Sequence, residues 1–148
     1  MKFVKIILIP FGLLYGLVMQ VRNWFYDFGI FKSKKFDIPV ISVGNISVGG
    51  TGKTPVVQFL VNHFSSRYQR IAIISRGYGR KSKGVQLVAS AGQIYLDAVQ
   101  AGDEPLMLAR TLPKTTVVVS EKRIAGIEMA INKFQADLII LDDAFQHR

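Results

Sequence analysis

The sequence predicts an α/β fold in which a parallel sheet is flanked by helices. From Asp37 onward, short β-branched runs alternate with segments of helical periodicity, which is typical of parallel strands joined by crossover helices. One of these runs leads into a glycine-rich loop that opens a helix. Ligands of such folds bind beyond the carboxyl ends of the strands, so we expect the functional residues at that edge.

The expected elements follow one another with short connections. The segments VQLVAS and QIYL flank Ala91 and Gly92 and predict a hairpin. The remaining strands are expected over 38–44, 70–75, 115–120 and 137–141, and the helices over 53–64, from about Asp103 onward, and over 122–134.

The stretch from Phe3 to Val21 is nearly all apolar and has lysine or arginine on both sides. Interruptions by lysine, proline and glycine leave it barely long enough to span a bilayer, which takes roughly 20 apolar residues. It lacks the cleavage site of a signal peptide. Aromatic residues from Trp24 to Phe28 predict a helix that lies in the membrane interface, and a buried core helix is the alternative. We therefore divide the chain into residues 1–36 and an α/β domain over 37–148.

Charge and cysteine content restrict the possible partners. The 148 residues carry a formal net charge of +9 and contain no cysteine, which excludes disulfides and thiolate metal sites. Such a basic surface favours anionic partners. No helix-turn-helix, zinc-finger or RNP pattern accompanies the charge, so we expect phosphorylated molecules or lipid head groups and no nucleic acid.

The run SVGGTGKT, residues 47–54, predicts a phosphate-binding P-loop, although serine replaces the first glycine of the usual pattern. Glycines let successive backbone N–H groups face phosphate oxygens, and the helix that follows adds its positive end. Lys53 is expected to reach the β- and γ-phosphates, and Thr54 to bind Mg²⁺. ATP and Mg²⁺ are therefore the predicted cofactors. The predicted ATP-binding residues are Ser47, Val48, Gly49, Gly50, Thr51, Gly52, Lys53 and Thr54.

Acidic residues near two strand ends are candidates for the remaining chemistry. Asp142 and Asp143 follow the last strand as a Walker-B pair would, and they are expected at the metal. Their alternative is a solvated strand end. Asp103 opens a helix in the segment GDEP, where it either accepts a hydroxyl proton during phosphoryl transfer or simply caps the helix.

The loop SRGYGRKSK, residues 75–83, follows the second strand and carries several cations around two glycines. Arg76, Tyr78 and Arg80 are predicted to contact substrate or nucleotide. A solvated basic loop is the alternative.

Six segments in this order resemble the tetraacyldisaccharide 4'-kinases, the lipid A 4'-kinase family: LYGLV, VGNISVGGTGKTP, SRGYGRKSKG, GDEP, VVVSEKR and LDDAFQHR. The resemblance implies a P-loop kinase on the cytoplasmic face of the inner membrane. Such an enzyme transfers the γ-phosphate of ATP to the 4'-hydroxyl of tetraacyldisaccharide 1-phosphate and forms lipid IVA. It also implies Lys53 and Asp103 as catalytic residues. Family members are longer, so we expect this chain to be an N-terminal part.

A second functional class stays open, a membrane-associated P-loop ATPase that phosphorylates no substrate. ATPases with a deviant P-loop carry an extra lysine where this chain has Val48, which counts against that class.

Overall fold

A computed structural model describes residues 15–21, 24–25, 34–44 and 52–142 of the chain. The chain divides into two compact units, Met1–Lys35 and Phe36–Arg148. In the first unit, residues 15–21 and 24–25 are helical, and nearly all of these side chains are exposed. None of the helices described is long and apolar enough to cross a membrane. The predicted interfacial helix over 1–36 falls largely on residues outside the described ranges.

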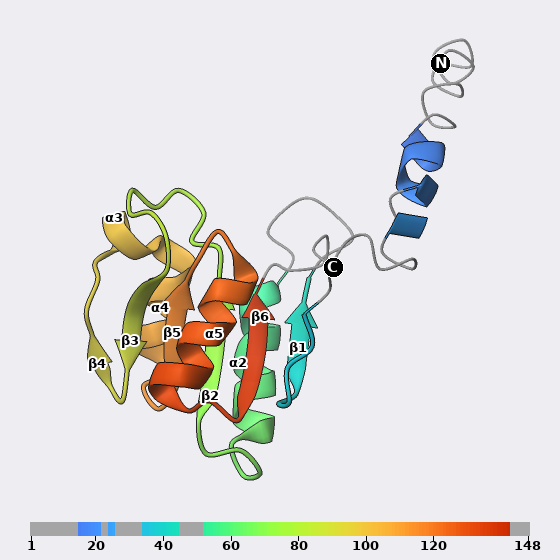
Figure 1. Cartoon of the computed structure of the whole chain (residues 1–148). Coiled ribbons are helices and arrows are strands. Elements are labelled where there is room, and N and C mark those ends of the chain that lie inside the picture. Colours follow the sequence, from blue (N-terminus) through green and yellow to red (C-terminus); the bar gives the residue numbers. More distant parts are fainter. Residues whose placement is uncertain (1–14, 22–23, 26–33, 45–51, 143–148) are drawn as a thin grey trace. The chain divides into compact units, whose positions relative to one another are not determined.

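The second unit is built on a six-stranded sheet in the order β1-β6-β2-β5-β3-β4, counted over the described residues (Figure 1). Its strands are β1 Val40–Val43, β2 Ile71–Ser75, β3 Gln86–Ser90, β4 Gln93–Ile94, β5 Thr116–Val119 and β6 Leu138–Asp142. The strands β1, β6, β2 and β5 run parallel. The predicted hairpin of β3 and β4 is confirmed, but it joins β5 in antiparallel fashion, so the prediction of a parallel sheet is corrected to a mixed one. The tight turn between β3 and β4 reverses the direction of the chain, so these two consecutive strands can only pair antiparallel.

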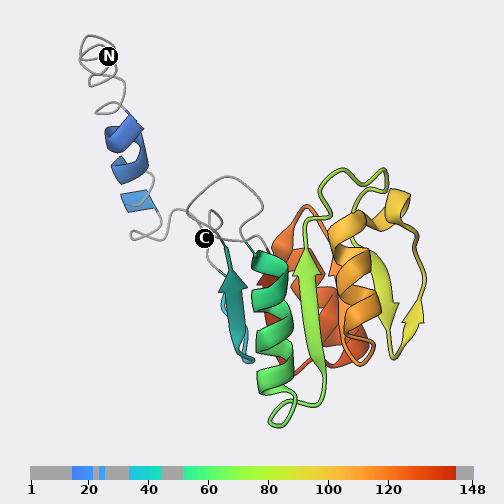
Figure 2. The ribbon, with the colours of Figure 1, turned by 180° about the vertical axis from the view of Figure 1, so that it is seen from behind.

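Helices cover both faces of this sheet. The helices are α2 Lys53–Phe64, α3 Ala98–Ala101, α4 Asp103–Thr111 and α5 Arg123–Phe134. Figure 1 and its reverse view in Figure 2 place α2 and α4 on one face and α5 on the other. The three longer helices confirm the predictions. The short α3 was not expected; its N-cap is Asp97, whose side chain accepts a hydrogen bond from the Gln100 N–H.

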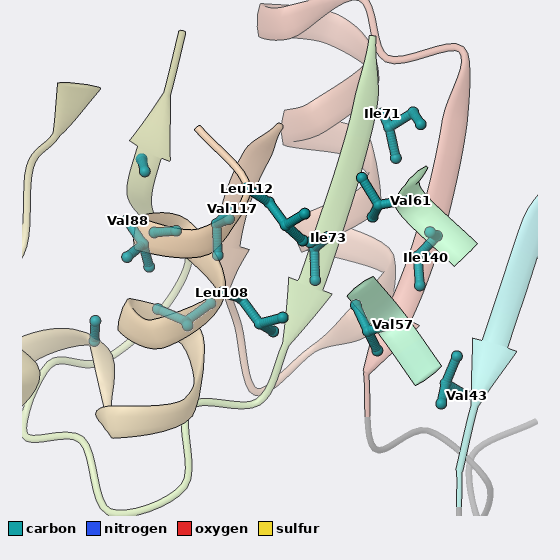
Figure 3. Packing of buried hydrophobic residues seen from close by; sticks show 14 of the residues in the cluster. Val43, Val57, Val61, Ile71, Ile73, Val88, Leu108, Leu112, Val117 and Ile140 are labelled. Atoms are coloured by element: carbon teal, nitrogen blue, oxygen red, sulfur yellow. The ribbon is translucent and has the colours of Figure 1, made fainter. Parts of the chain in front are cut away.

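The core lies between these layers. Every residue of β2 and β6 is buried, as expected for central parallel strands covered on both faces. On one face, Val57 and Val61 of α2 and Leu108 of α4 pack on sheet residues such as Ile73 (Figure 3). On the other face, α5 lies so close that a Cβ on Gly126 would be 2.8 Å from Ile74 Cγ2. This packing fixes the N-termini of α2, α4 and α5 at the carboxyl edge of the parallel strands.

Candidate active site

The end of the P-loop opens α2 as predicted. Gly52 is the N-cap residue of α2, and its φ of 74° lies in the left-handed region that glycine adopts without strain. Lys53 and Thr54 are the first two residues of the helix, so their side chains start at its positive end. The other predicted ATP-binding residues lie outside the described ranges: Ser47, Val48, Gly49, Gly50 and Thr51.

Asp142 ends β6 directly beside the strand that leads into the P-loop, since it pairs in register with Val43 of β1. Its side chain is fully buried, so the alternative of a solvated strand end is wrong for this residue. Ser75 Oγ donates a hydrogen bond to Asp142 Oδ2 over 3.2 Å, and Arg123 Nη2 donates to the Asp142 carbonyl over 3.1 Å. Asp143, the second predicted metal residue, lies outside the described part of the chain.

A hydrogen bond joins the P-loop helix to α4. Thr54 Oγ1 donates to Glu104 Oε1 over 3.0 Å, across 50 residues of sequence. The bond fixes the N-termini of α2 and α4 side by side. Two predicted features, the Lys53–Thr54 pair and the GDEP segment, are thus brought to one place.

Asp103 is the first residue of α4 and is exposed. Gly102 takes the N-cap position, and no side chain caps this helix, so the capping role considered for Asp103 is wrong. Its negative charge still lies in the first turn, at the positive end of the helix. The position leaves its carboxylate accessible to a hydroxyl group, next to Glu104 and hence to Thr54.

The basic loop after β2 lies on the junction between α3 and α4. The Lys81 N–H donates to the Val99 carbonyl over 2.8 Å, and Ser82 Oγ donates to the Gln100 carbonyl over 2.5 Å. The main chain approaches so closely that a Cβ on Gly102 would be 3.1 Å from the Tyr78 carbonyl oxygen. Arg76 and Tyr78 are exposed, Tyr78 to 94%, so two of the predicted contact residues are presented beside the Asp103 helix.

Arg80 differs from its neighbours because its side chain is only 3% exposed. Its guanidinium forms an ion pair with Glu121 at 2.6 Å and donates to Ser82 Oγ and to the Gly84 carbonyl. The alternative of a solvated loop is therefore wrong for this residue. Its predicted contact with substrate or nucleotide stays a prediction, but the guanidinium already has protein partners.

The oxygen donors suit Mg²⁺, which prefers hard oxygen ligands and keeps several waters. Thr54 and Asp142 supply a hydroxyl and a carboxylate at the carboxyl edge, and Glu104 brings a second carboxylate within hydrogen-bond reach of Thr54. Within the described ranges, no group of three or more histidine, aspartate or glutamate side chains could hold a metal by itself. The residues fit an ion that is also bound by phosphate oxygens and water.

A cavity of about 420 Å³ lies elsewhere, at the amino ends of the parallel strands. It is bordered by the end of α2 and the start of β2, including Val61, Tyr68 and Ile71. Since none of the predicted site residues lines it, the cavity is separate from the candidate site.

Several residues that contact the candidate site were not predicted from the sequence. Glu104 stands next to the predicted Asp103, and the paired acids of GDEP were a signal for it. The segment VVVSEKR had no predicted role. Its Glu121 forms the ion pair with Arg80, and its Arg123 donates a hydrogen bond to the Asp142 carbonyl. Ser75 could not be distinguished in sequence from any other serine at a strand end.

Comparisons with known proteins show the family of this chain. The model of a family described as LpxK, tetraacyldisaccharide-1-P 4'-kinase, matches residues 4–148. A tetraacyldisaccharide 4'-kinase of Chlorobaculum tepidum is 53% identical over 97% of the chain, and one of Aquifex aeolicus is 47% identical over 95%. The chain spans 42% and 44% of the length of these relatives.

A solved structure adds a three-dimensional comparison. It is described as the "apo" form of LpxK from Aquifex aeolicus in complex with ATP, and it is similar to this chain with a TM-score of 0.84 and 46% identity. The similarity covers 98% of the chain and 45% of the solved one.

Proposed function

The chain belongs to the tetraacyldisaccharide-1-P 4'-kinase family, and we propose that it forms the ATP-binding part of an enzyme that phosphorylates the 4'-hydroxyl of tetraacyldisaccharide 1-phosphate. The observation that carries the proposal is the hydrogen bond between Thr54 and Glu104. It joins the start of α2, where Lys53 and Thr54 lie, to the start of α4, where Asp103 lies. The loop that presents Arg76 and Tyr78 closely approaches Gly102, directly before α4. Groups suited to ATP, to proton transfer and to an anionic acceptor thus meet at one edge of the sheet.

The residues divide the reaction among them. Phosphoryl transfer has a loose transition state, so the protein contributes mainly positioning and charge stabilisation. Lys53 would bind the β- and γ-phosphates, while Thr54, Asp142 and Asp143 would hold Mg²⁺, which neutralises phosphate charge when it is bound. Asp103 would accept the proton of the 4'-hydroxyl. The hydroxyl oxygen bonds to the γ-phosphorus, and the bond between the γ-phosphorus and the oxygen that bridges to the β-phosphate breaks. ADP is then the leaving group.

Extending the chain with the C-terminal part of the Chlorobaculum tepidum relative gives a test of the whole reaction. Incubated with ATP, Mg²⁺ and tetraacyldisaccharide 1-phosphate, the folded chimera should add one phosphate to the lipid, which mass spectrometry detects. ATP hydrolysis without any mass gain of the lipid would contradict the kinase and support the alternative of a P-loop ATPase without a phosphorylated substrate.

We further propose that the N-terminal unit binds the cytoplasmic face of the inner membrane. Its apolar side chains Leu17, Val18 and Trp24 are each more than half exposed, and basic residues flank them in sequence. Apolar side chains next to aromatic and basic ones favour the boundary between head groups and acyl chains.

Liposome flotation tests this membrane contact. With vesicles that contain anionic lipid, the chain should float, and a chain without residues 1–35 should stay in the bottom fraction. Exposed apolar residues of the second unit, such as Phe59, supply a control, because Phe59→Ser should not reduce flotation. Equal flotation of the shortened chain would show that the second unit binds the membrane.

A further inference from the structure

We propose that Glu121 is a positioning residue for the acceptor substrate: it neutralises Arg80 and thereby holds the loop of residues 76–84 against the N-terminus of α4. The proposal rests on the proposed function only in identifying what the loop binds. It changes the role of Arg80, which the sequence predicts to be a contact to substrate or nucleotide.

The first argument is the environment of the Arg80 guanidinium. Its side chain is 3% exposed, whereas that of Glu121 is 46% exposed, so the ion pair joins a buried cation to a partly hydrated carboxylate. The pKa of Glu121 is lowered, first by a hydrogen bond from its own backbone and further by the charge of Arg80, so the carboxylate stays ionised at neutral pH. Removing a partner from a buried charge is costly, because the remaining charge must regain water. Without Glu121, Arg80 would have to move towards solvent.

The second argument is how closely the loop encloses Arg80. A Cβ on Gly77 would be 2.6 Å from Arg80 Cδ and 2.7 Å from the Ala101 carbonyl oxygen. The loop backbone is therefore in contact with the Arg80 stem on one side and with the end of α3 on the other. If Arg80 leaves this place, the residue directly before Tyr78 loses its support.

The third argument is the connection of Glu121 to the rest of the site. The Ser120 N–H donates to the Ser75 carbonyl over 2.9 Å, and Arg123 donates to the carbonyls of Ser120 and Asp142. The segment 120–123 thus contacts the end of β2, where the loop begins, and the end of β6. It fixes the loop relative to the residues that are proposed to act on ATP.

The two roles of Arg80 predict opposite results for Glu121→Gln. If Arg80 supports the loop, both Glu121→Gln and Arg80→Gln displace the loop, and the double variant adds little to either. If Arg80 binds the acceptor directly, loss of Glu121 releases the guanidinium and leaves acceptor binding unchanged or stronger. The effects of residues in one ion-pair network are expected to be non-additive.

The kinetic test uses the chimera described above and measures KM for the lipid, KM for ATP and kcat. Glu121→Gln and Arg80→Gln should each raise the lipid KM by about tenfold, with the double variant within about twofold of the larger single effect. KM for ATP should stay unchanged, which a general loss of folded protein would not produce. Lys114→Gln, which removes an exposed charge beside the cavity that is separate from the candidate site, is the control and should have wild-type values. An unchanged or lowered lipid KM in Glu121→Gln would overturn the proposal.

Hydrogen–deuterium exchange on the 148-residue chain tests the loop without any kinase activity. Glu121→Gln should accelerate exchange at the amides of Arg80 and Lys81, which donate to the Gly77 and Val99 carbonyls, and leave the amides of β2 protected. Unchanged exchange in the loop would overturn the positioning role. Faster exchange in the loop together with an inactive chimera would instead contradict the proposed function alone.

Discussion

Replacing Lys53 with alanine should lower phosphate transfer to the lipid by about two to three orders of magnitude, the loss expected when one group that stabilises transition-state charge is removed. Lys53 is the first residue of α2, directly after the N-cap Gly52. Its ammonium group is proposed to stay with the γ-phosphate while charge moves to the leaving oxygen. The initial rate of lipid phosphorylation at saturating ATP measures the effect.

Stability gives the necessary control for this variant. Alanine is the best helix former, so α2 should form as before and the midpoint of thermal unfolding should change little. Lys53→Arg keeps the charge but changes its shape, and it should recover only part of the rate. Lys114→Ala removes an exposed lysine beside the cavity at the amino ends of the parallel strands and should leave the rate unchanged. A Lys53→Ala rate close to that of Lys114→Ala would exclude Lys53 from the reaction.

Local sequence patterns were sufficient to predict most elements of the fold. The helix over 53–64 agrees with α2, and the strands over 70–75 and 137–141 lie within a residue or so of β2 and β6. These segments combine clear periodicity with strong start signals, such as the glycines before Lys53. The short α3 escaped prediction because four residues do not reveal a helical period.

The order of the strands in the sheet could not be predicted from local sequence patterns. That β6 lies between β1 and β2, and so places Asp142 beside the strand before the P-loop, depends on pairing between residues about 100 positions apart. The same limit explains Arg80. In sequence it is one of several cations around two glycines, and only the fold brings Glu121 to it from 41 positions away. Patterns therefore picked out the segments of the candidate site, and long-range contacts decided which of their side chains have protein partners.

Replacing Asp103 with asparagine should reduce kcat by about two to four orders of magnitude, the range found when a general base is removed. Asparagine has nearly the same shape but accepts no proton at neutral pH. Binding of ATP should persist, since the proposed phosphate contacts come from the P-loop and Lys53. Titration with ATP together with the rate of lipid phosphorylation separates these two effects.

A loss of kcat that comes from the missing proton acceptor can be distinguished from one that comes from a less stable fold. Gly102 is the N-cap of α4, so the carboxylate of Asp103 contributes to stability mainly through the helix dipole, worth about 0.3–1 kcal/mol. The midpoint of thermal unfolding should therefore fall only slightly. Asp37→Asn changes another exposed aspartate, before β1 and away from the carboxyl edge, and should leave kcat unchanged. If Asp103→Asn lost stability and kcat in proportion, Asp103 would be a structural residue, and the proton acceptor would have to be sought in the neighbouring Glu104 or outside this chain.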